Sequence, residues 1–335
     1  MATEGQLPRT FHIGGYWRGA NDMVRQMMLG LRAAGAEVYE FNTDENPQAL
    51  DCEGRPYDRG TFGPVWLQWE AIRFQIEQFR PNLIICNAGG LSFRPEDATR
   101  LRKSMMLLGV ALSDPDVFPA ATSHIAPNFD LFLTNAPSCI AGYRARGANA
   151  GVLPLATNEN FFHPVPACPE LDCDVLMIGR ASPDRIKPMR RLCGLFRVHL
   201  YGEGWEDHGL PSRGPIYSND VLRALNSARI SLIFSRTPAG HAIAKVAVFD
   251  FIASGALVAT ERIPDLEGCF EYDREIIGFG NTDGLIEKID YYLRHPEHAD
   301  AIRAAGRRRV LAEHTWEKVW PAIIEQIRTL KLAGC

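Results

Sequence analysis

The chain has 335 residues, of which 46% are hydrophobic and 23% charged, and its formal net charge is −4. The apolar share excludes a disordered chain, and the near-neutral charge excludes nucleic-acid binding by bulk electrostatics. The sequence has no apolar run of the roughly 18 residues that a membrane span needs, and its start, MATEGQLPRT, lacks the apolar core of a signal peptide. We therefore expect a cytoplasmic protein of two domains.

Metal-binding motifs are weak throughout the sequence. Its eight cysteines include no CxxC pair, which is typical of reduced structural thiols. The Asp-Pro-Asp sequence at 114–116 is interpreted as a turn because of its proline. His295 and His298 have a spacing typical of metal ligands, but Pro296 between them favours a solvated helix cap. We expect no metal site and no cofactor.

Short apolar strands alternate with amphipathic helices through the first half of the chain. Strands are predicted at 11–13, 37–41, 82–86, 109–113, 130–134 and 151–154, and helices from 20 to about 34 and at 65–79, 96–107, 120–126 and 137–146. The first helix places Met23, Met27 and Leu31 on one face and is closed by Gly35. This alternation predicts a parallel sheet with helices on both faces.

Three prolines interrupt the rhythm in 156–173, which we interpret as a linker. The second half then repeats the pattern, with strands predicted at 174–178, 197–201, 230–234 and 256–259 and helices at 184–194, 219–227, 242–254, 283–294, 297–309 and 314–331. The expected organisation is a Rossmann-like domain over 1–155, a second over 174–313, and a final helix in 314–335 that is able to cross back to the first.

Ligands bind beyond the carboxyl ends of parallel strands, so two such domains facing a cleft predict a site for two substrates. Arg180, Arg185 and Lys187 follow the first strand of the second half. They could neutralise a diphosphate, or they could simply begin a solvated helix. Farther along, Tyr217 precedes the helix predicted at 219–227.

The stretch 235–260 carries the strongest signal for a binding site. A loop with Gly240 leads to His241 and Ala242, where we predict the start of a helix whose free amides can bind an anion. Lys245 is expected one turn into this helix. Asp250 lies among apolar neighbours farther along, and such a carboxylate needs partners, for which sugar hydroxyls are suited.

Asp250 stands five positions before Gly255, in a pattern that resembles the donor-site helix of GT-B glycosyltransferases. Over most of the chain, an ordered set of segments resembles the spore-protein, CgeB-like glycosyltransferase family: FDLFLTN, GANAGVLPLATNENFFHP, DVLMIGR, YGEGW, KVAVFDFIASGALVATERIPDLEGCF and HTWEKVW. The resemblance implies an α/β GT-B fold, in which two doubly wound Rossmann-like domains face a cleft and C-terminal helices close the structure.

The resemblance also implies a metal-independent glycosyltransferase of the hexosyl type. Its donor would be a nucleotide-diphosphate sugar, linked to UDP or GDP, and its unknown acceptor would offer a hydroxyl or amine. Asp250 would hold the ribose hydroxyls. The diphosphate would be held by Arg185, Lys187 and the helix start at 240–242, and the backbone around Tyr217 would flank the base. Asp250 corresponds to the second acid of the family's E-x7-E motif, whereas Ala242 replaces the first, which leaves the contact to the donor sugar and the stereochemical outcome open.

The first strand runs into a glycine-rich turn that we expect to face the cleft. It contains Gly15, Tyr16, Trp17 and Arg18. The two aromatic side chains could line an acceptor pocket, and Arg18 could reach the donor phosphates. Beyond the strand at 109–113, Asp114 is our first candidate for a general base that deprotonates the acceptor, with His124 as the second. Asp114 could also merely cap the following helix.

Two other functions remain open from the sequence. A GT-B-fold epimerase or hydrolase would act on the nucleotide sugar itself, but it would need paired acids or histidines around the sugar. A non-catalytic nucleotide-sugar-binding protein would be compatible with Ala242 in place of an acid. No oligomeric state is indicated.

Overall fold

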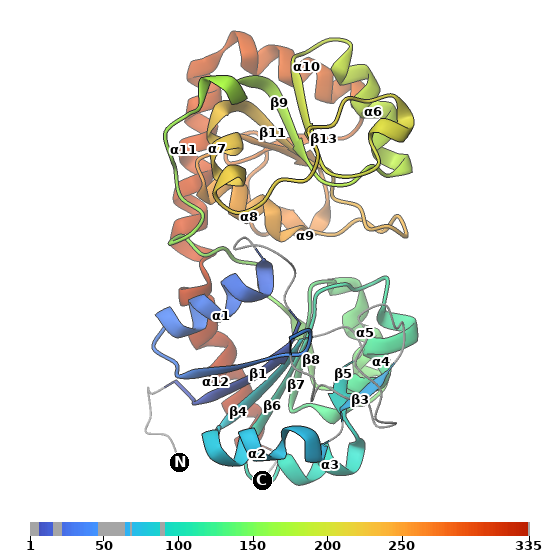
Figure 1. Ribbon diagram of the computed structural model, residues 1–335, viewed down its shortest axis with the longest axis vertical. Coiled ribbons are helices and arrows are strands. Elements are labelled where there is room, and N and C mark those ends of the chain that lie inside the picture. Colours follow the sequence, from blue (N-terminus) through green and yellow to red (C-terminus); the bar gives the residue numbers. More distant parts are fainter. Residues whose placement is uncertain (1–6, 16–21, 46–63, 68, 88–90, 334–335) are drawn as a thin grey trace. The chain divides into compact units, whose positions relative to one another are not determined.

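The computed structural model describes residues 7–15, 22–45, 64–67, 69–87 and 91–333, which divide into two compact α/β units (Figure 1). Within these ranges, unit 1 runs to Pro154 and resumes at Trp316, and unit 2 comprises Leu155–Thr315. The predicted linker, 156–173, therefore belongs to unit 2. The six cysteines in the described ranges are free thiols. None of the helices described there has the length and apolar character to cross a membrane.

Unit 1 is built on a six-stranded parallel sheet in the order β2-β1-β4-β6-β7-β8. Its strands are β1 (Thr10–Gly14), β2 (Val38–Asn42), β4 (Leu83–Asn87), β6 (Met106–Ala111), β7 (Leu131–Thr134) and β8 (Ala150–Val152). A separate parallel pair consists of β3 (Val65–Leu67) and β5 (Leu91–Phe93). The strand order reverses beside β1, which is where doubly wound sheets open a crevice.

The helices of unit 1 include the C-terminal one. They are α1 (Met23–Ala33), α2 (Trp69–Phe79), α3 (Pro95–Leu101), α4 (Ser123–Ile125), α5 (Ile140–Arg144) and α12 (Trp316–Ala333). As predicted, α1 buries Met27 and Leu31, and Gly35 follows it with a φ of +102°. Figure 1 shows α12 beside α1, and the indole Nε1 of Trp320 donates to the Met27 carbonyl at 2.9 Å. The last helix is thus part of the core of unit 1.

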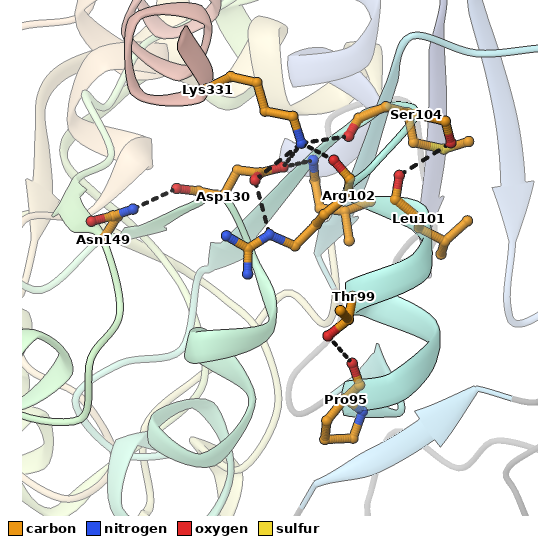
Figure 2. A network of polar contacts seen from close by, with 10 residues as sticks. Pro95, Thr99, Leu101, Arg102, Ser104, Asp130, Asn149 and Lys331 are labelled. Carbon is orange, nitrogen blue, oxygen red and sulfur yellow. Dashed lines mark hydrogen bonds and ion pairs between the residues drawn. The ribbon is translucent and has the colours of Figure 1, made fainter. Parts of the chain in front are cut away.

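A buried carboxylate ties the end of α12 to the amino-terminal edge of this sheet (Figure 2). Asp130 is 6% exposed and accepts hydrogen bonds from the Leu107 amide at 2.8 Å and from Arg102 Nε at 2.9 Å. Lys331 lies 3.4 Å from both Asp130 oxygens and donates to the carbonyls of Arg102 and Met105. Because it takes the backbone carbonyls that follow α3, Lys331 helps to end that helix before β6.

Unit 2 repeats the architecture with a five-stranded parallel sheet in the order β10-β9-β11-β12-β13. Its strands are β9 (Cys173–Ile178), β10 (Val198–Tyr201), β11 (Ala228–Ile233), β12 (Val258–Glu261) and β13 (Ile277–Phe279). Its helices, seen around the sheet in Figure 1, are α6 (Pro183–Cys193), α7 (Asn219–Ser227), α8 (Val246–Ala253), α9 (Pro264–Glu267), α10 (Thr282–Arg294) and α11 (Pro296–Glu313). Here the order reverses beside β9, so a crevice is expected beyond β9 and β11.

Three predicted elements differ from the structure. The helix predicted at 65–79 is wrong at its start, because 65–67 pair with 91–93 as strands and α2 begins at Trp69. The helix predicted at 96–107 ends at Leu101, and the following strand begins at Met106. The helix predicted at 242–254 begins only at Val246. In each case contacts from distant segments override a local apolar pattern.

Candidate functional site

The loop after β9 is fixed to the loop after β10 in unit 2. The Gly179 amide donates to the Tyr201 carbonyl at 2.8 Å, and the Ala181 amide donates to the Glu203 carbonyl at 2.9 Å. The indole Nε1 of Trp205, a fully buried side chain, donates to the Gly179 carbonyl at 2.8 Å. The backbone that follows β9 therefore has one defined path at the edge where the sheet opens.

Glycine is required where the two loops touch. Gly202 has a φ of +123°, and a Cβ at this position would overlap the carbonyl of Gly179. Its amide also donates to the Gly214 carbonyl at 2.9 Å. Gly202 thus joins the loop after β9 to the segment that leads into α7. The sequence pattern Tyr-Gly-Glu-Gly-Trp signals this close approach, but it does not identify the segment approached.

Arg185 is the cation that this arrangement holds in place. It lies in the first turn of α6, and its guanidinium donates to the Arg180 carbonyl at 3.0 Å. Its Nε is buried and has no hydrogen-bond partner among the described residues. Burial lowers the pKa of Arg185, and the nearby carboxylates of Asp184 and Glu261 oppose this effect. A cation whose position the protein already fixes is suited to binding an anion.

The other two predicted cations are less constrained. The Arg180 side chain is 82% exposed and lies 3.6 Å from Glu203. Lys187 is also exposed, on the surface of α6. The structure therefore fixes only Arg185 at the strand ends, and it leaves the other two cations at the surface of unit 2.

Glu261 belongs to this edge of the sheet, although sequence reasoning missed it. It ends β12, and its carboxylate accepts from the Ser235 amide at 2.8 Å and from Arg236 Nε at 3.3 Å. The carboxylate thereby holds the start of the loop that follows β11. The sequence shows an acid at the end of the apolar strand that Glu261 closes, and this pattern could have pointed to it. The sequence does not show that the Ser235 amide, 26 positions away, donates to this carboxylate.

A hollow of about 590 Å³ lies beyond the end of β10. Tyr201 and the half-exposed Tyr217 line it, together with Ile216, Asp220 and Arg223. Cys168, Glu170 and Leu171, which precede β9, form another part of its wall. The hydrogen bond from the Gly179 amide to the Tyr201 carbonyl connects this lining to the loop after β9. The volume of the hollow is within the range of small-molecule sites, about 300–1,000 Å³, and it combines aromatic and charged groups.

The predicted helix start at 240–242 is wrong. Gly240 closes a tight turn with a φ of +89°, and its amide donates to the Thr237 carbonyl at 2.9 Å. The His241 amide donates to the Thr237 hydroxyl, and Ala242 pairs with Arg236 in an antiparallel bridge.

Lys245, which we expected inside the helix, is instead the N-cap residue of α8, with an extended backbone. The amides of Gly240 and His241 are therefore already used within the loop. Any anion site at this helix would have to use the amides at the start of α8.

Asp250 lies within α8 and faces the interior of unit 2. It is 7% exposed, and its Oδ1 accepts from the Thr157 hydroxyl at 2.7 Å. Thr157 in turn pairs with Thr315 in a parallel bridge. The open carboxylate expected from the sequence is therefore a buried one that already has a hydroxyl partner.

Burial raises the pKa of Asp250 to about 8, and the hydrogen bond from Thr157 opposes this rise. In an unfolded chain an aspartate has a pKa of about 4, so the Asp250 carboxyl binds its proton more tightly in the folded state than in the unfolded state. The protonated carboxyl favours the fold at acid pH, and this contribution is lost as the pH rises from about 4 through about 8. Near neutral pH, Asp250 is mostly uncharged.

The structure contradicts a general-base role for Asp114. Its side chain is fully buried in unit 1 and accepts from Thr122 at 2.8 Å, from Thr134 at 2.6 Å and from the Tyr143 hydroxyl. Burial and the adjacent carboxylate raise the pKa of Tyr143, so this phenol remains a donor. An acceptor substrate cannot reach a carboxylate enclosed by three hydroxyls.

The remaining predicted residues of unit 1 give little support for a site. His124 is exposed on α4, and its Nε2 lies 3.1 Å from the Pro119 carbonyl. Gly15 is buried directly after β1. Tyr16, Trp17 and Arg18 lie outside the described residues.

Comparison with known proteins bears on the fold and on part of the sequence. Residues 183–325 match the family model described as glycosyl transferase-like. No curated protein matches the sequence.

Sucrose-phosphate synthase from Thermosynechococcus elongatus has a similar structure, with a TM-score of 0.65 and 17% identity over 97% of this chain and all of that one. AviGT4, a glycosyltransferase involved in avilamycin A biosynthesis, has a TM-score of 0.63 and 17% identity over 98% of this chain and 99% of its own. HepE from Anabaena in complex with UDP has a TM-score of 0.62 and 10% identity over 96% of this chain and all of its own. The fold is therefore GT-B, as expected from the sequence.

Proposed function

We propose that this protein is a glycosyltransferase whose unit 2 binds the nucleoside diphosphate of a sugar donor. The observation that carries the proposal is the hydrogen bond from the Gly179 amide to the carbonyl of Tyr201, a residue that lines the hollow. It links the hollow to the loop after β9, where the Arg180 carbonyl holds the Arg185 guanidinium. A cation beside an aromatic hollow offers complementary sites for a diphosphate and for a nucleobase.

In this proposal the leaving diphosphate lies against the loop after β9. Breaking the bond between sugar and phosphate moves negative charge onto the diphosphate while the sugar acquires oxocarbenium character. Arg185 already stands at the strand ends, so little reorganisation is needed to stabilise that charge. The exposed Arg180 and Lys187, and Lys245 at the N-cap of α8, are further cations that could join it, so the proposal needs no metal ion.

The base would occupy the hollow after β10. Tyr217 is 50% exposed, so its ring is accessible for stacking. Asp220 and Arg223 lie 3.6 Å apart on α7 and present both a hydrogen-bond acceptor and a donor to the hollow. This set can accommodate uracil or guanine, in line with a UDP- or GDP-linked donor.

Asp250 enters the proposal as a ribose ligand only if its present partner is replaced. A ribose hydroxyl would take the place of the Thr157 hydroxyl on the same carboxyl group. Ala242 cannot supply the contact to the donor sugar that the first acid of the E-x7-E motif would make. The sugar and the stereochemical outcome are therefore not part of the proposal.

The comparisons support this assignment. The glycosyl transferase-like match begins at the first residue of α6, the helix that carries Arg185. The similar fold of HepE has been observed with UDP and with UDP-glucose. The CgeB-like subfamily, hexosyl transfer and metal independence are our further proposals for this chain.

The experiment is incubation of the purified protein with a panel of UDP- and GDP-sugars, in the presence of excess EDTA, with release of UDP or GDP as the readout. We expect release with at least one donor, because the diphosphate site needs no metal, and we expect acceptor hydroxyls or amines to accelerate it. Release that appears only after Mg²⁺ is added would contradict metal independence. Conversion of the donor into an isomer without release would instead indicate an epimerase.

A binding protein without catalysis gives a third result in the same experiment. It would bind UDP or GDP in a thermal-shift assay but would release neither from any donor. Failure to bind either nucleotide would remove the donor site itself. The two failures are distinct, because the first concerns only the chemical step.

A further inference from the structure

Three aromatic rings lie together where α10 meets α11 in unit 2. The ring centroids of Tyr291 and His295 are 4.5 Å apart, and those of His295 and His298 are 5.5 Å apart with planes inclined by 20°. Tyr291 and His298 are also stacked, at 5.7 Å. The two imidazoles are therefore held nearly parallel by their local packing, although they lie at the surface.

A carboxylate stands between the two imidazoles. Glu297 Oε1 lies 3.4 Å from His295 Nδ1 and 4.0 Å from His298 Nε2. One donor atom from each of the three residues lies within 4.8 Å of the others. Around a tetrahedral Zn²⁺ with bonds of about 2.0–2.1 Å, donor atoms are roughly 3.3 Å apart, so small side-chain rotations would bring these three to one ion.

The second nitrogen of His298 is also engaged. Its Nδ1 lies 2.6 Å from the Tyr291 hydroxyl oxygen. Histidines that bind metals usually donate their other ring N–H to an oxygen, which fixes the tautomer and the ring orientation. If Nδ1–H donates to Tyr291, the lone pair of Nε2 is directed at the side on which Glu297 lies.

The structure also changes our interpretation of His295. The sequence favours a helix cap at this position, and His295 is indeed the N-cap residue of α11, but its side chain makes no capping hydrogen bond. Its imidazole is therefore not committed to the amides of the helix. Instead it packs on Tyr291 and contacts Glu297.

We propose that His295, Glu297 and His298 bind one Zn²⁺ ion or a similar borderline divalent ion, with water completing the coordination. Nitrogen and carboxylate ligands in this ratio suit Zn²⁺, Co²⁺ and Ni²⁺ better than Mg²⁺ or Ca²⁺. The three side chains are 43%, 63% and 56% exposed, respectively, so the site is open to solvent.

The charge at this position also favours a cation. The positive end of the α11 dipole disfavours a bound cation, but the carboxylate of Glu297 lies in the first turn of this helix and compensates the dipole. A bound ion would tie the end of α10 to the start of α11.

The experiment is a calorimetric titration of the full chain with Zn²⁺, alone and after each of the substitutions His298→Ala and Tyr291→Phe. We expect one equivalent to be lost, or its Kd raised at least about 10-fold, in His298→Ala. Tyr291→Phe keeps all three ligands but removes the orienting oxygen, and we expect a smaller rise in Kd.

The matched control is His163→Ala, which removes an exposed histidine outside the cluster and should leave the titration unchanged. Zn²⁺ that binds to cysteines would remain bound in both His298→Ala and His163→Ala, so it can be distinguished from Zn²⁺ bound at the proposed site. Circular dichroism checks that each variant is folded, and UDP binding should be the same in all of them. Identical Zn²⁺ stoichiometry and Kd in the wild type and in His298→Ala would overturn the proposal.

Discussion

Replacing Arg185 by alanine is expected to weaken the binding of UDP or GDP by about 10- to 100-fold. On the proposed function, the substitution removes a charge-assisted hydrogen bond to the diphosphate that is worth about 1.5–3 kcal/mol. Arg185 is already oriented by the Arg180 carbonyl, so the free protein spends little free energy in positioning it. Isothermal titration with UDP, UMP and GDP measures the effect, and the loss should be smaller for UMP, which lacks the second phosphate.

The matched control for this substitution is Arg190→Ala. Arg190 is an exposed arginine on the same helix, and it donates to the His208 carbonyl at 3.0 Å. Its removal changes the net charge equally but should leave nucleotide binding within about twofold, because exposed charges contribute little. Equal losses in both variants would mean that only the overall charge of α6 matters and that Arg185 has no specific role.

Replacing Asp114 by alanine is expected to destabilise unit 1 by about 3 kcal/mol. The change removes the common acceptor of the buried hydroxyls of Thr122, Thr134 and Tyr143. The Tyr143 hydroxyl can still donate to Thr122 at 2.7 Å, but the hydroxyls of Thr122 and Thr134 lose the acceptor of their hydrogen bonds, and an unsatisfied buried group is costly. Asp114→Asn retains one acceptor oxygen and should cost less. Denaturant unfolding followed by a probe in unit 1 measures the difference.

Glu77→Ala serves as the control for Asp114, because Glu77 is an exposed acid of unit 1 that pairs with Arg73 on the same helix. Its substitution should change stability by at most about 0.5 kcal/mol. If Asp114→Asn were as stable as the wild type but transferred sugar far more slowly, Asp114 would be catalytic after all. Our account predicts that UDP affinity in unit 2 is the same for both Asp114 variants.

Much of the fold could be predicted because the local patterns agree with the tertiary structure. The apolar run at 82–86 is the central strand β4, and the alternation of strands and helices identifies two parallel sheets. The spacing of Met27 and Leu31 identifies the buried face of α1. In these elements the residues that form the core are close in sequence, so their periodicity is visible.

The errors occur where strand pairing or a turn decides the local structure against the apolar pattern. Residues 65–67 form a strand only because 91–93 pair with them. The loop before α8 resists helix formation because Ala242 pairs with Arg236 and Gly240 turns the chain. A single sequence shows the apolar pattern of such segments but not their pairing partners.

The candidate site was predicted in part. The residue types that follow β9 predict a binding role for Arg185, which the structure holds at the strand ends, and Tyr217, predicted to lie by the base, lines a hollow; both roles stay predictions. The contact of Asp250 with Thr157 spans 93 positions, and the enclosure of Asp114 depends on three separate segments. A carboxylate looks the same in sequence whether it is open to a ligand or buried against hydroxyls.

The central claim is that one nucleotide site in unit 2 joins the loop after β9 to the hollow before α7. Hydrogen–deuterium exchange with and without saturating UDP or GDP tests it most directly, because it reports on backbone amides without requiring catalysis. We predict slower exchange in both 179–187 and 214–220, and no change at 130–134 of unit 1. Unchanged exchange in both segments with either nucleotide, or protection confined to unit 1, would contradict the account.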